Sequence, residues 1–148
     1  MIREAIQGTA VETVYPLLQR GGRITPFPTR YWLHDPVARQ RMGELERGGA
    51  VGLLERQIAA DVRLRHAFAK DHAAYRDERW QALTPDDRAW VAARPEIRRA
   101  FAGGIGGTAD FTRIKCLHLH WAHHLAVGGT TAGRLIAAML DREKTQQI

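Results

Sequence analysis

The chain has 148 residues, of which 45% are hydrophobic and 26% charged, with a formal net charge of +6. This composition is typical of a globular protein rather than a disordered one, and the length predicts one domain, residues 1–148, with its own core. No apolar run approaches the roughly 20 residues of a membrane-spanning helix and the first residues do not resemble a signal peptide, so we expect a cytoplasmic protein without membrane contact.

β-Branched and aromatic residues are concentrated in residues 10–33, on both sides of a turn sequence, Gln19-Arg20-Gly21-Gly22-Arg23. This pattern predicts two short strands that form a β-hairpin. Proline cannot donate a ladder hydrogen bond, so the hairpin is expected to be irregular and to lie at an edge. The prolines in question are Pro16, Pro26 and Pro28.

Residues 25–29, Thr-Pro-Phe-Pro-Thr, stiffen the second strand of the predicted hairpin. They form either a rigid turn, in which Phe27–Pro28 is a candidate for a cis bond, or a wall that presents a polar site. In the second interpretation the residues presented to a pocket are Arg30, Tyr31 and Trp32.

Helix start and stop signals follow this arm. Asp35-Pro36 joins a capping carboxylate to a proline suited to the first helical position, which predicts a helix as far as Arg47. Gly48-Gly49 then ends it. Residues 51–83 contain no proline and carry an imperfect apolar stripe, which predicts one long helix or two with a break in residues 66–70.

Further helices are predicted in the second half of the chain. Thr84-Pro85 repeats the start signal, and Pro95 begins another helical stretch to about Ala102. A helix over residues 110–126 is ended by glycines, and a last helix covers residues 131–144.

The sequence therefore predicts a mainly α fold of the α+β type. Five to six helices in residues 35–144 are expected to pack with a small hairpin arm in residues 10–33. Basic and acidic side chains are interleaved in residues 39–47, so most arginines are expected on solvated helix faces.

The predicted helix over residues 110–126 contains the only cysteine and four of the seven histidines. At about 100° per residue, Cys116, His120 and His123 fall together on the side opposite an apolar stripe. His118 falls within the apolar stripe. The outer face of this helix thus offers sulfur and nitrogen ligands instead of the usual Lys and Glu.

Three interpretations of this face stay open. Cys116, His120 and His123 bind zinc or iron together with a ligand from elsewhere. Alternatively, Cys116 is a reactive thiol whose pKa is lowered by Lys115 and by an early helical position, with His120 as its base. In the third, Cys116 is a small buried apolar residue and the histidines bind backbone groups or solvent. A single cysteine excludes an intramolecular disulfide.

A glycine-rich run, residues 103–107, precedes this helix. Such a run can turn its amide groups toward one point, which suits a phosphate or carboxylate, and Arg113 and Lys115 would add positive charge. A flexible connector is the equal alternative. The run is neither a P-loop nor a dinucleotide fingerprint, because the required lysine and preceding strand are missing.

Two stretches resemble the bacterial family of uncharacterised proteins called DUF501: residues 25–33, Thr-Pro-Phe-Pro-Thr-Arg-Tyr-Trp-Leu, and residues 114–120, Ile-Lys-Cys-Leu-His-Leu-His. The resemblance covers most of the chain but departs at residues 128–131, where the family has an Asn-Pro-Val-Gly-like turn. The chain also lacks the N-terminal cysteines of many members, which disfavours a metal site shared by the two ends. The resemblance implies no reaction. The resemblance also implies that, in many bacteria, members are encoded beside a septum-formation initiator and an exopolyphosphatase-like protein. This association favours an anion-handling role over a nucleic-acid one.

The leading hypothesis is a site for a phosphorylated or other anionic ligand, metal-assisted or not, enclosed by the hairpin arm, the glycine run and the cysteine-bearing helix. Cys116, His118 and His120 would supply metal ligands or proton transfer near neutral pH, and whether the chain is an enzyme stays open. The predicted ligand-binding residues are Arg30, Tyr31, Gly104, Gly106, Gly107, Arg113 and Lys115. The alternatives are a module that binds nucleic acid or an acidic protein, and a homodimer interface lined by histidines.

Overall fold

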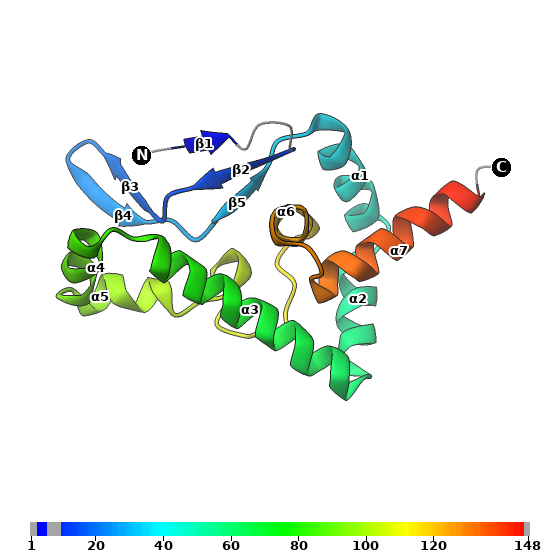
Figure 1. Cartoon of the computed structure of the whole chain (residues 1–148). Helices are drawn as coiled ribbons and strands as arrows, with labels where there is room; N and C mark the ends of the chain where they lie inside the picture. Colours follow the sequence, from blue (N-terminus) through cyan, green and yellow to red (C-terminus); the bar gives the residue numbers. More distant parts are fainter. Residues whose placement is uncertain (1–2, 6–9, 147–148) are drawn as a thin grey trace.

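The structure, a computed structural model, describes residues 3–5 and 10–146. These residues form seven α-helices, two 3₁₀ turns and five short strands (Figure 1). The strands are β1 (Arg3–Ala5), β2 (Val11–Val14), β3 (Leu17–Arg20), β4 (Arg23–Pro26) and β5 (Tyr31–Leu33). The helical segments are α1 (Pro36–Arg47), α2 (Ala50–Ala59), α3 (Val62–Ala82), α4 (Pro85–Ala92), α5 (Pro95–Arg98), η1 (Arg99–Phe101), η2 (Ile105–Gly107), α6 (Leu117–Val127) and α7 (Thr131–Gln146).

The mainly helical fold with a small N-terminal β region is confirmed, but the predicted number of helices, five to six, is too low for the described residues. The predicted hairpin is present as β3 and β4 around Gly21-Gly22, whose φ angles of 54° and 78° favour glycine. The prediction of only two strands is wrong. Pro16 separates β2 from β3, and the Pro26 to Pro28 segment, with a trans Phe27–Pro28 bond, separates β4 from β5.

β2 lies in the middle of an antiparallel sheet of order β1-β2-β5. Val11 pairs with Leu33 and Thr13 with Tyr31. Because side chains alternate along a strand, Tyr31 and Leu33 are buried while Trp32, between them, is 40% exposed. The buried side of this sheet therefore presents Tyr31 to the helices.

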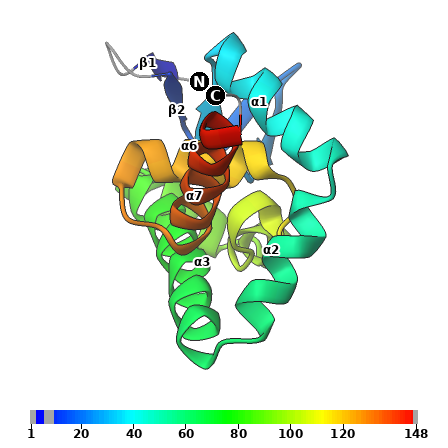
Figure 2. The same ribbon diagram turned by 90° about the vertical axis from the view of Figure 1, so that its right-hand side faces the viewer.

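Helix α6 lies at the centre of the molecule, between the sheet and α3, and Figure 2 shows α7 crossing beside it. The main core surrounds α6 with buried residues from β2, β5 and most of the helices, among them Met42, Leu54, Phe68, Leu117 and Ile136. A smaller apolar cluster at the end formed by α4 and α5 consists of Leu17, Leu83, Val91 and Phe101.

The helix starts agree with local capping. Asp35 accepts the Ala38 N–H at 3.0 Å at the start of α1, and Thr84 accepts the Asp87 N–H at 3.1 Å at the start of α4. The break in residues 51–83 lies earlier than predicted. Asp61 accepts the Arg63 N–H at 2.8 Å and so starts α3 before residues 66–70 are reached.

None of the described helices is both long and apolar enough to cross a lipid bilayer.

Gly133 allows α7 to approach α6 closely, since a Cβ there would lie 2.0 Å from the His124 Cγ. We expect Gly133→Ala to lower the free energy of unfolding by at least about 2 kcal/mol in urea denaturation, through overpacking. Gly52→Ala is a matched control, because Gly52 is also the third residue of its helix and meets only the flexible Arg56 side-chain end, at 3.2 Å. It should stabilise α2 by up to about 1 kcal/mol. Equal effects of the two changes would contradict the close contact.

Candidate functional site

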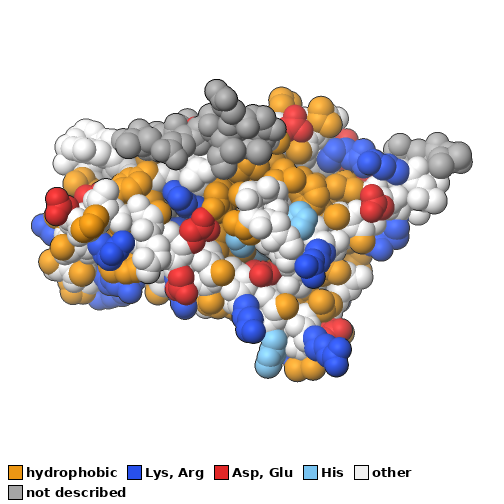
Figure 3. Space-filling view, in the orientation of Figure 1, with side chains coloured by type: hydrophobic (Ala, Val, Ile, Leu, Met, Phe, Trp, Pro, Cys, Tyr) orange, Lys and Arg blue, Asp and Glu red, His pale blue; other side chains and the backbone are white. Residues whose placement is uncertain are grey.

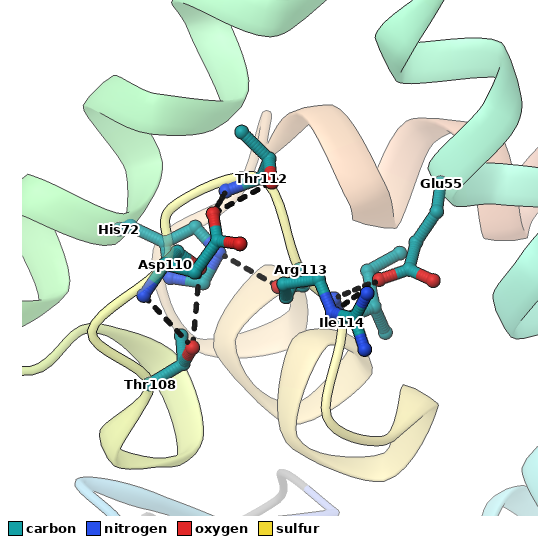
Figure 4. Close-up of polar contacts among 7 residues, drawn as sticks. All are labelled: Glu55, His72, Thr108, Asp110, Thr112, Arg113 and Ile114. Carbon is teal, nitrogen blue, oxygen red and sulfur yellow. Dashed lines mark hydrogen bonds and ion pairs between the residues drawn. The ribbon is translucent and has the colours of Figure 1, made fainter.

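The helix that carries the histidines begins at Leu117 rather than near residue 110, and Cys116 is its N-cap with extended backbone angles. Asp110 causes the difference. Its carboxylate accepts the Thr112 N–H at 2.9 Å and the Thr112 hydroxyl at 2.6 Å, which stabilises a turn in place of a helix (Figure 4). Cys116 therefore lies outside the helix, and the predicted shared face with His120 and His123 does not form.

His72 of α3 holds the segment before α6 in place. Its Nδ1 accepts the Ile105 N–H at 3.0 Å, so the ring proton resides on Nε2, which donates to the Arg113 carbonyl at 3.2 Å (Figure 4). The ring is fully buried, and burial lowers its pKa. One neutral imidazole thus fastens the glycine run to the turn that precedes Cys116.

The glycine run is a close-packed element. A Cβ on Gly104 would lie 2.4 Å from the His72 Nδ1. Besides Ile105, two amides of the run bind protein groups: Gly104 N–H donates to the Thr108 carbonyl at 2.8 Å and Gly107 N–H to the Gly104 carbonyl at 2.9 Å. These contacts do not support the predicted anion-binding role of Gly104 and Gly107. Gly106 accepts the Lys115 Nζ at its carbonyl, at 3.1 Å, so this lysine is also engaged by the protein.

The other residues predicted to bind an anion are held by two different glutamates. Arg30 lies 3.9 Å from the Glu78 carboxylate of α3, and the buried Tyr31 hydroxyl hydrogen-bonds to the same group. Arg113 lies 3.6 Å from Glu55 of α2. These contacts give Arg30 and Tyr31 a structural role between the sheet and α3.

His120 and His123 face the core rather than the outside. They are 2% and 3% exposed, and their rings pack on Phe68 and Tyr75 of α3. Burial lowers the pKa of His120 to about 3 and that of His123 to about 4. A buried ring with so low a pKa stays neutral near pH 7, which argues against the predicted proton-transfer role of His120. Within residues 10–146, His120 Nε2 and His123 Nδ1 have no hydrogen-bond partner.

Cys116 and His118 meet a residue that the sequence interpretation did not single out, Glu46 of α1. One ligand atom from each lies within 4.8 Å of the others, and in the described part of the chain this is the one such group of three metal-ligand residues. The predicted metal set of Cys116, His120 and His123 does not form such a group.

Glu46 organises this group. Its Oε1 accepts the Leu117 N–H at 2.8 Å and lies 2.9 Å from the His118 Nδ1, while His118 Nε2 lies 3.1 Å from the Arg39 carbonyl. His118 thus turns toward α1, and not into the apolar stripe where it was predicted. Glu46 was missed because it pairs with residues some 70 positions away, and no local pattern signals that pairing.

The Cys116 thiol is half-buried, and its pKa is raised, first by burial and further by the Glu46 carboxylate. The predicted lowering by Lys115 is only a minor contribution. At neutral pH the free residue is therefore a protonated thiol, which argues against the reactive-thiolate interpretation.

An open groove of about 780 Å³ lies beside the Glu46, Cys116 and His118 cluster. One face of α1 forms most of it, at the helical spacing i, i+3, i+4, i+7. The lining residues are Pro36, Arg39, Gln40, Gly43, Glu46, Arg47 and His118. The sequence already shows this polar stripe, with a glycine inside the helix. The prediction that these side chains lie on a solvated helix face did not consider that the same face could line a groove.

A family model described as "Protein of unknown function (DUF501)" matches residues 2–138 of the chain. No curated protein and no solved structure matches the chain.

Replacing His72 with alanine should lower the free energy of unfolding by about 2–5 kcal/mol, because Ile105 N–H and the Arg113 carbonyl lose their buried partner. Urea denaturation measures this. His66→Ala, at an exposed position of the same helix, is the control and should change stability by less than about 0.5 kcal/mol. A small effect of His72→Ala would show that the bridge is dispensable.

The buried His123 predicts acid sensitivity. Its native pKa of about 4 lies below the unfolded value of 6.5, so below pH 6.5 the unfolded chain binds a proton that the native protein does not. Stability is complete above that pH and falls as pH decreases toward 4, by about 2 kcal/mol for this residue at pH 5. His123→Phe should flatten the fall in free energy of unfolding between pH 7 and 5. An unchanged slope would contradict a neutral, buried ring.

Proposed function

The chain belongs to the DUF501 family, whose description names no function, and from its own residues we propose that it binds zinc through Glu46, Cys116 and His118. The ion would help to hold a small anionic ligand in the adjacent groove.

The main support is the donor set. A carboxylate oxygen, a thiol sulfur and an imidazole nitrogen lie within 4.8 Å of one another. Ligand atoms around a tetrahedral zinc ion are roughly 3.5 Å apart, so small side-chain rotations bring the three into range. Mixed sulfur, nitrogen and oxygen ligands suit zinc, and iron is the second choice.

The surroundings of His118 also fit a metal ligand. In the free protein both ring nitrogens face acceptors, Glu46 and the Arg39 carbonyl, and a neutral ring can donate to only one of them. With a metal on Nδ1, the ring would donate its Nε2–H to the Arg39 carbonyl. Metal-binding histidines regularly make such a second hydrogen bond, which fixes ring orientation.

Cys116 would bind zinc as a thiolate. Because burial and Glu46 raise the pKa of the free thiol, zinc binding must release its proton and should strengthen as pH rises.

Three protein ligands leave a fourth zinc position open, as in sites that bind substrate or water. Arg39 and Arg47 line the groove next to it, and a guanidinium group matches a carboxylate or phosphate with two parallel hydrogen bonds. A small phosphorylated or carboxylated molecule is therefore the ligand class that we propose.

Calorimetric titration of the chelator-treated protein should show one zinc ion bound per chain, with proton release. Cys116→Ser and His118→Gln should each weaken binding at least about tenfold, since each removes one ligand of three. His66→Gln, at an exposed position on α3, is the control and should bind as the wild type does. Zinc binding of unchanged strength in both ligand variants would rule out this site, and elemental analysis of the purified protein would reveal iron in its place.

Pyrophosphate is a probe for the anion. Zinc-loaded protein should bind it more tightly than metal-free protein, and Arg39→Gln with Arg47→Gln should weaken that binding about tenfold or more. Arg56→Gln combined with Arg65→Gln, at exposed positions on α2 and α3, makes the same charge change away from the groove. Equal pyrophosphate binding by all variants would show that the groove arginines do not bind the anion.

A further inference from the structure

A second polar pocket, of about 420 Å³, lies where the C-terminal part of α3 meets α5 and η1. Its lining combines arginine with aromatic side chains: Arg76, Asp77, Trp80, Gln81, Arg98, Phe101 and Ala102. We propose that this pocket binds a nucleotide, either free or at the end of a nucleic-acid strand. The phosphate would bind Arg76 and Arg98, and the base would lie against Trp80.

The two arginines have donors to spare. The Arg98 guanidinium carbon lies 4.1 Å from the Trp80 ring centroid, and an arginine stacked on a ring keeps its in-plane N–H groups free to hydrogen-bond. Among the described residues, no acceptor binds the Arg98 side chain. Arg76 uses its Nε for Asp77, at 2.9 Å, and its terminal nitrogens donate to no described residue. Both groups can therefore engage a phosphate without losing an existing contact.

A buried positive charge lies behind the same pocket. Arg79 is fully buried, and its guanidinium carbon lies 4.8 Å from the centroid of the Phe101 ring that lines the pocket. Its terminal nitrogens donate to two carbonyls, of Phe27 at 2.9 Å and Ala100 at 3.4 Å. Within residues 10–146, its Nε has no partner and no carboxylate forms an ion pair with it.

An unpaired buried charge is costly, and in a low-dielectric interior its field is weakly screened. The neighbouring Glu78 does not relieve it, because that carboxylate binds Tyr31 and Arg30 instead. An anion in the pocket would add negative charge near Arg79, and the pocket itself carries a net positive charge, because Arg76 and Arg98 outnumber Asp77. This charge balance selects an anionic ligand over a neutral one.

Trp80 and the guanidinium plane of Arg98 stacked on it favour a ligand with a flat body over a bare phosphate, whereas Phe101 is buried and offers no free ring face. Any nucleobase can stack on an aromatic ring or on the plane of an arginine side chain. Such stacking contributes about 1–3 kcal/mol per base to the free energy of binding. A pocket of this volume is also within the usual range for small-molecule sites. Arg94 over Trp90, at 4.1 Å, repeats the arrangement next to it, and Figure 3 shows basic and hydrophobic side chains together at the end formed by α4 and α5.

The test is a calorimetric titration of the full chain at low salt with AMP, adenosine and inorganic phosphate, in the presence of a chelator so that zinc binding plays no part. We expect AMP to bind more tightly than either of its parts. Arg98→Gln and Arg76→Gln should each weaken AMP binding about tenfold, the loss of one charged hydrogen bond. Arg65→Gln, an exposed position near the other end of α3, is the matched control and should leave AMP binding unchanged.

A 5′-phosphorylated hexanucleotide distinguishes the two sources of the ligand. Tighter binding than AMP, with steep salt dependence, identifies a strand end, whereas binding equal to that of AMP identifies a free nucleotide. The inference is overturned if neither AMP nor the hexanucleotide binds, if phosphate alone binds as well as AMP, or if both arginine variants bind AMP as the wild type does. Circular dichroism confirms that the variants fold.

Discussion

The bridge made by His72 is the contact on which the arrangement around α6 depends. Two segments that precede α6, residues 103–107 with η2 and residues 108–116, each give one backbone group to this ring. Both ring nitrogens are used, which fixes the tautomer and requires a neutral imidazole. Phe68 and Phe111 pack against the ring on two sides and complete its burial. The residue at position 104 must then be glycine, because any Cβ there would overlap the ring.

From this anchor the rest of the site follows. The position of residues 108–116 sets where α6 begins, and that start turns His120 and His123 toward the rings of α3 and β5. It also brings Cys116 and His118 against α1. Of the four histidines, His120 and His123 take part in a buried aromatic core, partly exposed His124 binds Thr130, and His118 lies beside the groove. Of these four, His118 alone lines the groove, together with Glu46.

Local chemistry predicted much of the fold. Asp35, Thr84 and the glycines after α1 and α6 act within a few residues, so their effects were readable from the sequence. The start of α6 was misplaced because the Asp110 turn competes with a helix, a competition that the pattern Thr108-Ala-Asp110-Phe-Thr112 already contained. Once the helix start moved, the assignment of its histidines to faces changed with it. The partnership of Glu46 with His118, and that of His72 with two loops, depend on tertiary contacts, which no local pattern encodes.

Glu46 also supports the start of α6. The same oxygen that approaches His118 also satisfies the first amide of α6, where the N-cap side chain makes no such bond within the described structure. The groove and the central helix consequently share one atom. A ligand that bound in the groove would stabilise the folded chain by mass action: at 100 times its dissociation constant it would add about 2.7 kcal/mol to the free energy of unfolding. The amount of folded protein in a cell would then report how much of that ligand is available.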